Sequence, residues 1–404
     1  MTKYLLFFCV LLFLGGNVQN YFGISHDSFD VVVVSFGFFF TLLNKHNLSR
    51  SQQNVIVFVV VFGILKLLID SGAGTKAAVL PIWGTIFLFS AFPRCYQYEK
   101  IRILQLKKKM LRVLIIFFVV ECGVALIERI LGYTIFPWIG GVTLDIETMK
   151  TGFRSVSLHG HPLNNALMVS TMMSFLLLSP LKPVYKFSLW LMGFLAILCF
   201  NTRSSMIANT LLLGVYVLYS LFADKTMMWR NKNKVLVISV IVFLCGYFLF
   251  TNGYVGGRLL DMGIMDEHSS KARINVWNML NHFDILAHPL GVSYGEMRRI
   301  AYVSGVLFIE NFWIIWLIRF GYIFLVGYVI VYCVFLKDLN KNYTRFQFFF
   351  SFGTFILIAS TNNSLASGMI APFFYLICAS LFDPSLFVQI VPQKYLAKNR
   401  IVTH

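Results

Sequence analysis

Residues 252–311 read NGYVGGRLLDMGIMDEHSSKARINVWNMLNHFDILAHPLGVSYGEMRRIAYVSGVLFIEN, the longest stretch of the chain that cannot lie within a lipid bilayer. Elsewhere, apolar runs of roughly 15–22 residues follow one another, which is the length that crosses a hydrocarbon core of about 30 Å. The chain is 58% hydrophobic and only 13% charged, about half the charge of a soluble domain. These features predict an all-α polytopic membrane protein, a single transmembrane domain over residues 1–404. Strands are not expected, because the runs are continuous rather than alternating.

The apolar runs predict about twelve transmembrane helices. The first run, after Lys3, resembles a signal peptide but lacks a small-x-small cleavage site, so we interpret it as an uncleaved span. The approximate spans are 4–20, 29–43, 55–69, 77–92, 112–131, 162–179, 186–201, 204–222, 235–251, 307–335, 346–361 and 369–388.

Lysines and arginines are distributed unequally between the two sides of these spans. One set of connections, together with both termini, holds 22 of them, whereas the other set holds nine, five of which lie in residues 252–306. The positive-inside rule then predicts cytoplasmic termini and a large outward-facing loop at 252–306. The formal net charge of +17 therefore reflects topology and contact with anionic lipid, and not nucleic-acid binding.

The large loop is predicted to contain a helix that lies on the membrane interface. Ser269 and Ser270 can cap this helix, and Pro289 ends it. The apolar residues that recur at every third position and predict its membrane-facing side are Ile274, Trp277, Leu280 and Phe283.

Several charged residues fall well inside the predicted spans or near their ends. Glu121 and Arg319 lie in the middle of spans, where charges are functional candidates, and we expect them to pair with each other or with another span. Lys66 lies near the end of one span, and the adjacent residues Glu128 and Arg129 lie near the end of another. We expect these side chains to extend to the membrane–water interface.

Arg203 stands in a very short turn, which places it at the head of a helix at the outer interface. A fixed cation beside helix N-terminal N–H groups suits phosphate oxygens. An arginine that contacts lipid headgroups fits the same position.

Arg154, His159 and His161 precede Pro162, where another span begins. Histidines in such a place are more often solvated loop residues than functional ones. Three further arginines are predicted on the same face of the membrane: Arg203, Arg258 and Arg273. Several guanidiniums there could hold a pyrophosphate, each charge-assisted contact contributing about 1.5–3 kcal/mol.

Glu310 stands at the outer mouth of the next span and is followed by Asn311. A carboxylate at a helix entrance complements the helix dipole, which is one role for it. A general base is the other.

Four features in this order resemble the family of O-antigen and capsule polymerases and ligases, polytopic glycosyltransferases with a GT-C-like membrane fold. They are Arg154-x₇-Pro162-x-Asn164, Asn201-Thr202-Arg203-Ser204-Ser205, Arg273-x₃-Trp277 before His288-Pro289-Leu290-Gly291-x₃-Gly295, and Glu310-Asn311 before a span with Phe320-Gly321. The resemblance covers about residues 150–330.

This resemblance implies a bacterial inner-membrane enzyme that polymerises oligosaccharide repeat units carried on undecaprenyl pyrophosphate, at the periplasmic face and without a metal or cofactor. Glu310, Arg203 and Arg273 would be catalytic. The residues that would bind substrate are Arg154, His159, His161, Asn165, Arg258 and Asn311. Nearby arginines would depress the pKa of Glu310, so this carboxylate could instead orient the acceptor hydroxyl and leave His159 or His161 as proton acceptor.

The expected partners are lipid-linked oligosaccharides and membrane lipids, with a chain-length regulator and a flippase besides, and no nucleic acid. A ligase that transfers glycan to lipid A core is one alternative, although ligases commonly have His-Asn where this chain has Glu310-Asn311. A lipid-linked oligosaccharide flippase is the non-enzymatic alternative. Flippases favour charges along a central cavity between two similar halves, and this sequence shows no such internal similarity.

Single cysteine substitutions test the predicted topology. A membrane-impermeant thiol reagent should label positions in the large loop and spare positions in the connections rich in lysine and arginine. The positions for labelling are Ser270 and Ser293, and the protected ones are Lys45, Lys108, Arg230 and Lys341. Labelling of the second group in intact cells would overturn the orientation.

Overall fold

The structure is a computed structural model that describes residues 14–23, 26–43, 48–91, 100–136, 153–223, 229–251, 275–306, 309, 311–361, 364–367 and 370–385. Within these ranges the fold is all-helical and contains no β-strand, as predicted. Most of the predicted first span, residues 4–20, lies outside the described residues.

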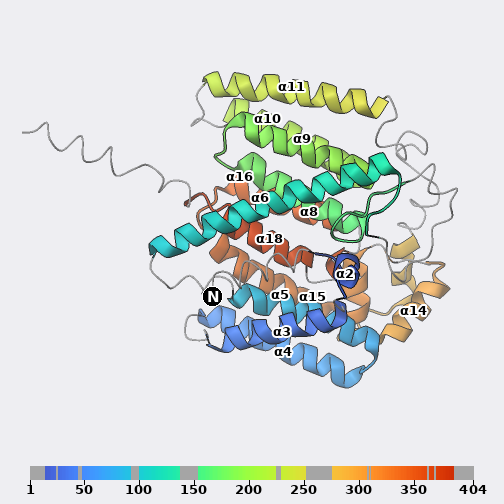
Figure 1. The fold of residues 1–404 in the computed structure, drawn as a ribbon. Helices are drawn as coiled ribbons and strands as arrows, with labels where there is room; N and C mark the ends of the chain where they lie inside the picture. Colours follow the sequence, from blue (N-terminus) through green and yellow to red (C-terminus); the bar gives the residue numbers. More distant parts are fainter. Residues whose placement is uncertain are drawn as a thin grey trace, which may run out of the picture.

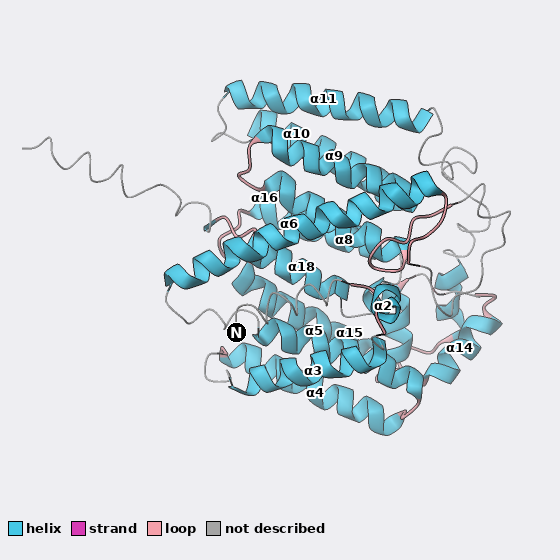
Figure 2. Cartoon of the chain, viewed as in Figure 1, coloured by secondary structure: helices cyan, strands magenta, loops and turns pink. Residues whose placement is uncertain are grey.

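Each apolar run predicted after the first coincides with a helix (Figures 1 and 2). The longer helices are α3 (His26–Leu43), α4 (Arg50–Ile69), α5 (Ala73–Ala91), α6 (Lys100–Leu131), α8 (Pro162–Leu178), α9 (Pro183–Phe200), α10 (Arg203–Leu218), α11 (Trp229–Thr251), α15 (Phe312–Leu339), α16 (Arg345–Ala359) and α18 (Ile370–Leu381). The shorter elements are α2 (Gly16–Tyr21), η3 (Tyr219–Ala223), η4 (Met279–His282), α14 (Tyr294–Val303) and α17 (Ser364–Ser367).

Five helices of the described part are long and apolar enough to cross a membrane. They are α4, the part of α6 from Gln105 to Leu131, α9, α10 with η3, and α15. Four shorter apolar helices lie in α5, α8, α16 and α18. A helical membrane protein is therefore supported, whereas the number of twelve spans stays a prediction.

Helix α8 forms the centre of the bundle. Every side chain from Asn165 to Leu177 is buried, because α9, α16, α18 and α10 all pack against it. A helix that is apolar on all sides is typical of such an enclosed position. In contrast, α11 lies along the outer edge, beyond α9 and α10 (Figure 1).

Helix α15 begins later than predicted and is broken in its interior. It starts at Phe312, not at 307, because the side chain of Asn311 caps it by accepting hydrogen bonds from the backbone N–H groups of Trp313 (2.9 Å) and Ile314 (3.3 Å). The break is at Gly321, whose φ of 79° and ψ of 170° are not helical.

The break in α15 receives a segment of the large loop. The N–H of Val292 donates to the carbonyl oxygen of Ile318 (2.9 Å), which the break leaves available. A Cβ at position 321 would lie 2.0 Å from the carbonyl oxygen of Pro289, so only glycine allows this approach. Since Gly321 is nine residues into the helix, the segment penetrates about 14 Å below the start of α15.

Charged side chains of the spans fasten the same segment. Lys66 is buried and donates to the carbonyl oxygens of Leu290 (3.1 Å) and Val292 (2.9 Å), so the prediction that it extends to the interface is wrong. Arg319 donates to the carbonyl oxygen of Gly74, and its guanidinium lies 5.1 Å from the ring centre of Tyr294. Of the two expected pairings, the one between Arg319 and Glu121 is not found: Arg319 binds the backbone of another predicted span, at Gly74 of α5, and Glu121 accepts the N–H of Leu158.

The predicted interfacial helix ends earlier than expected, at His282, and has a side that packs against protein. Ser269, Ser270 and Ile274 lie outside the described residues. Residues 275–278 are helical and continue into the tighter η4, which changes the rotation per residue from about 100° to about 120°. Val276, Met279 and Phe283 are buried against protein, whereas Trp277, which was predicted to face the membrane, is 55% exposed.

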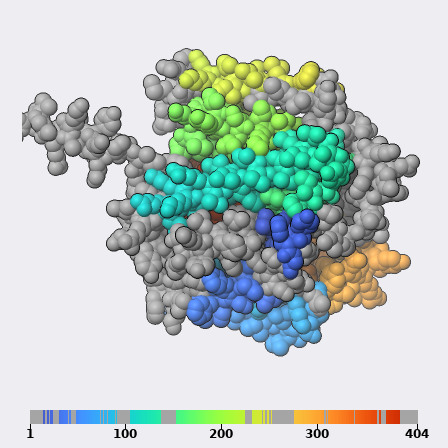
Figure 3. Space-filling view, viewed as in Figure 1, coloured from blue at the N-terminus to red at the C-terminus, as the bar shows by residue number. Residues whose placement is uncertain are grey.

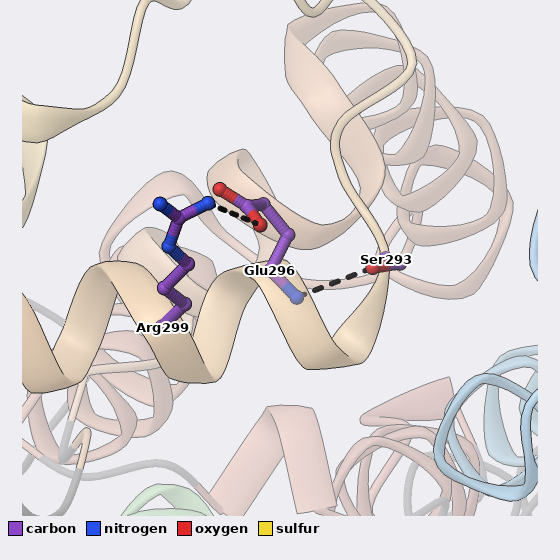
Figure 4. Close-up of polar contacts among 3 residues, drawn as sticks. All are labelled: Ser293, Glu296 and Arg299. Carbon is purple, nitrogen blue, oxygen red and sulfur yellow. Dashed lines mark hydrogen bonds and ion pairs between the residues drawn. The ribbon is translucent and has the colours of Figure 1, made fainter.

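The amphipathic helix of this loop is α14. Ser293 caps it by accepting a hydrogen bond from the N–H of Glu296 (3.2 Å), and the Glu296 carboxylate lies 3.7 Å from the guanidinium of Arg299 (Figure 4). Its apolar side packs with η4 against α15 through Met297 and Ile300. The loop is therefore anchored to protein on this side.

Replacement of Gly321 by alanine should destabilise the protein by more than about 1 kcal/mol, because the φ is positive and the Cβ meets the Pro289 carbonyl. Thermal unfolding in detergent, followed by intrinsic fluorescence, measures the effect. Gly353→Ala on α16 is the matched control, since a Cβ there meets nothing within 4 Å. Equal melting temperatures for the two variants would contradict the proposed packing at the break.

Candidate functional site

The loop of residues 153–161 is held by two carboxylates of α6. One oxygen of Glu128 accepts hydrogen bonds from the N–H groups of Val156 (2.8 Å) and Ser157 (3.0 Å). Glu121 accepts one from the N–H of Leu158 (3.2 Å). Both carboxylates are buried, so the prediction that Glu128 reaches the interface is wrong. The acceptors also stabilise the positive φ of 45° at Ser157, which is uncommon for a residue other than glycine.

These bonds bring Arg154 to the turn that contains Arg203. The Nε–H of Arg154 donates to the carbonyl oxygen of Phe200, the last residue of α9 (3.1 Å). Asn201 then adopts a left-handed conformation (φ 55°), and Arg203 is the first residue of α10. Two predicted site residues that are 49 positions apart in the sequence therefore lie at the same helix–helix turn.

His161 is the N-cap of α8. Its Nδ1 accepts a hydrogen bond from the N–H of Leu163 (3.3 Å). Burial, and secondly the nearby Arg154 charge, lower the pKa of His161 to about 4. A neutral imidazole with one nitrogen engaged and a low pKa is a weak proton acceptor.

His159 is 6% exposed and lies against Phe117, with ring centres 5.6 Å apart. Neither of its ring nitrogens has a hydrogen-bond partner among the described residues. Burial lowers the pKa of His159 to about 3. The position of this side chain, enclosed beneath the loop, favours a neutral packing residue over a base that contacts substrate.

Asn165 and Asn311 both have local roles. The Nδ2–H of Asn165 donates to the carbonyl oxygen of Val156, which ties the first turn of α8 to the loop. Asn311 caps α15. The adjacent Trp313 donates from its indole nitrogen to the Ser360 hydroxyl (3.0 Å).

The end of α16 connects α15 with α10. Ser360 receives the Trp313 bond, and the hydroxyl of the next residue, Thr361, lies 3.0 Å from that of Ser204 on α10. Helices α8 and α10 both run antiparallel to α9, because only short turns join α8 to α9 and α9 to α10 while α9 packs against both. Helices α8 and α10 are therefore parallel to each other, and Asn209 of α10 donates to Ser170 of α8 (2.8 Å). The N-termini of α8, α10 and α15 therefore gather at one end of the bundle.

This end of the bundle suits an anion. The first four residues of the three helices are Pro162-Leu163-Asn164-Asn165, Arg203-Ser204-Ser205-Met206 and Phe312-Trp313-Ile314-Ile315, none of which is acidic. Helix N-termini carry partial positive charge, and two arginines add full charges beside them. In the described part of the chain, His, Cys, Asp and Glu nowhere form a group of three that could hold a metal ion.

Three predicted site residues, Glu310, Arg258 and Arg273, lie outside the described residues. The structure brings together Arg154, His161, Arg203 and Asn311, and it places His159 and Asn165 beneath the loop rather than at its surface. Sequence reasoning missed the positioning role of Glu121 and Glu128. Their spacing of seven residues, which places both on one helix face, was the available signal.

Comparison with models of protein families, with curated proteins and with solved structures finds no match for this chain.

The lowered pKa of His159 predicts a loss of stability in mild acid. The unfolded chain gains a proton on this histidine as the pH falls below about 6.5, whereas the folded chain does so only near pH 3, so folding stability decreases across that window. The loss reaches about 2 kcal/mol at pH 5. Melting temperatures in detergent between pH 7.5 and pH 5 should fall less steeply for His159→Phe than for the wild type. His282→Gln, at an exposed position, is the control and should follow the wild type; an unchanged slope in His159→Phe would refute the assignment.

Proposed function

We propose that this protein is a bacterial inner-membrane glycosyltransferase, with cytoplasmic termini and a GT-C-like fold, that polymerises undecaprenyl-pyrophosphate-linked oligosaccharides at the periplasmic face. The observation that carries the proposal is the meeting of Arg154 with the turn that bears Arg203. Guanidinium groups beside helix N-termini match the geometry and charge of a pyrophosphate. The resemblance of the sequence to O-antigen and capsule polymerases implies that this anion is the pyrophosphate of a lipid-linked oligosaccharide.

In the proposed reaction, Arg154 and Arg203 bind the pyrophosphate of the donor, and Arg273 joins them. A hydroxyl of the acceptor glycan attacks the anomeric carbon of the donor sugar. The bond between this carbon and the phosphate oxygen breaks, and undecaprenyl pyrophosphate leaves with the bonding electrons. The arginines stabilise the charge that develops on the leaving oxygen.

Glu310 directly precedes Asn311, the cap of α15, so we assign it the acceptor side of the reaction. It takes the proton of the attacking hydroxyl, or orients that hydroxyl through its charge. The low pKa values of His159 and His161 favour Glu310 over either histidine for the proton.

Deletion of the gene tests the proposed function by its glycan products. Loss of a polymerase should leave lipid A core, or an equivalent carrier, capped with a single repeat unit. Loss of a ligase would leave the core bare while polymer accumulates on undecaprenyl pyrophosphate, and loss of a flippase would leave it bare with unpolymerised units inside the cell. A ladder of normal length would reject all three functions.

Complementation of the deletion strain tests the site residues. Arg203→Lys should lose most polymer at unchanged protein abundance, because bidentate phosphate contact needs a guanidinium and not only a charge. Glu310→Gln should be similarly inactive. Arg299→Lys is the matched control, since Arg299 is exposed and pairs with Glu296 on α14. Full polymer in Arg203→Lys would exclude the pyrophosphate contact.

A further inference from the structure

An apolar groove of about 700 Å³ lies between α9, α10 and α11. Its walls include Trp190 and Phe194 of α9, Leu211 and Gly214 of α10, and Val240 and Phe243 of α11. Figure 3 shows α11 as the outermost element beside the surface of α9 and α10. The volume lies in the range of about 300–1,000 Å³ that accommodates small-molecule ligands.

The groove offers a ligand almost no polar group. The hydroxyl of Thr210 donates to the carbonyl oxygen of Met206 (2.9 Å), and that of Ser239 donates to Val235 (2.6 Å), so both are satisfied within their own helices. A groove with so little polar lining favours a hydrocarbon occupant over ordered water.

The groove begins close to the two arginines of the site. Met206, three residues after Arg203, contributes to the wall, and the groove continues along α10 as far as Leu218. Twelve helical residues correspond to a length of about 18 Å. The outer side of α10 exposes apolar residues such as Leu211 (64%) and Leu218 (58%), so the groove opens sideways toward the hydrocarbon of the bilayer.

From this arrangement we propose that the groove binds the polyprenyl tail of the lipid-linked donor, with the pyrophosphate at Arg203 and Arg154. This inference rests on the proposed function, which supplies the donor. The acyl chain of a bilayer phospholipid has similar apolar chemistry. The charges near the groove favour a polyprenyl pyrophosphate over a phospholipid. Two arginines at the head of the groove match a multivalent pyrophosphate better than a phosphodiester with one negative charge.

Gly214 allows a specific test. It lines the groove in the last third of α10, and a Cβ built there meets nothing within 4 Å, so a larger side chain can fill the groove without a clash. Gly214→Phe occupies the space of the tail, and Gly214→Leu does so with less volume. Gly353→Phe is the matched control, because Gly353 is also helical, exposed and open, and it lies on α16 away from the groove.

The experiment measures binding of radiolabelled undecaprenyl pyrophosphate and geranyl pyrophosphate to the purified full chain in nanodiscs of phosphatidylethanolamine and phosphatidylglycerol. Gly214→Phe should weaken undecaprenyl pyrophosphate binding by at least about tenfold, equivalent to about two buried methylene groups. Geranyl pyrophosphate binding should be unchanged, because its short tail ends before Gly214. Gly214→Leu should show a smaller loss with the same selectivity, and Gly353→Phe none.

Three results would overturn the inference. Wild-type affinity in Gly214→Phe would exclude the groove as the tail site, and equal losses for both probes would assign the effect to the head-binding residues or to folding. Native mass spectrometry that finds phosphatidylglycerol in the wild type and none in the variant, with undecaprenyl pyrophosphate binding intact, would make the groove a bilayer-lipid site. A normal glycan ladder in the deletion strain would reject the proposed function. The binding assay would still test the groove in that case, because a loss of undecaprenyl but not geranyl pyrophosphate binding does not depend on enzymatic activity.

Discussion

The arrangement of the candidate site depends on hydrogen bonds between the buried carboxylates of α6 and the backbone of the 153–161 loop. A carboxylate removed from water is costly unless its oxygens accept hydrogen bonds, and backbone N–H groups outside regular helices have the same requirement. Glu128 satisfies both requirements, because its two oxygens accept hydrogen bonds from the N–H groups of Ile135, Val156 and Ser157. Glu121 does so through one oxygen, which accepts the N–H of Leu158, whereas its Oε1 has no partner among the described residues. The bonds fix the loop, the loop holds Arg154 beside the end of α9, and the same loop leads into the capped start of α8.

The positively charged side chains within the spans also bind irregular backbone. They donate hydrogen bonds to carbonyl oxygens, whereas the glutamates accept hydrogen bonds from N–H groups. Lys66 binds two carbonyl oxygens of the segment that enters the break in α15, and Arg319 binds that of Gly74. Lys186 donates to the carbonyl oxygens of Leu177 and Ser179, where α8 ends. In a bilayer, every irregular backbone segment needs partners within the protein. These charged side chains therefore build the architecture and stabilise non-helical backbone among the helices.

The sequence predicts features that depend on local patterns and misses those that depend on contacts between distant residues. The bilayer dictates the length of an apolar run, so each run after the first coincides with a helix. The connection between the spans on either side of Arg203 is very short, so this residue was correctly predicted at the start of a helix. The partners of Lys66 and Arg319 lie more than 200 positions away, and no local pattern encodes them. The protein-facing side chains Val276 and Met279 of the large loop were not predicted, because their partners on α14 and α15 are distant in the sequence.

The use of these charges also bears on mechanism. A transporter that moves a charged head group across the membrane needs polar side chains available along a path through the bundle. Lys66, Lys186 and Arg319, which lie inside the described bundle, are bound to backbone carbonyls. The arginines of the candidate site lie instead at one end, where three helices begin and a hydrocarbon groove starts. In the proposed function, an anion site at this end and the adjoining groove would restrict the chemistry to a single membrane face, with the lipid entering from the side and its head group remaining at the interface.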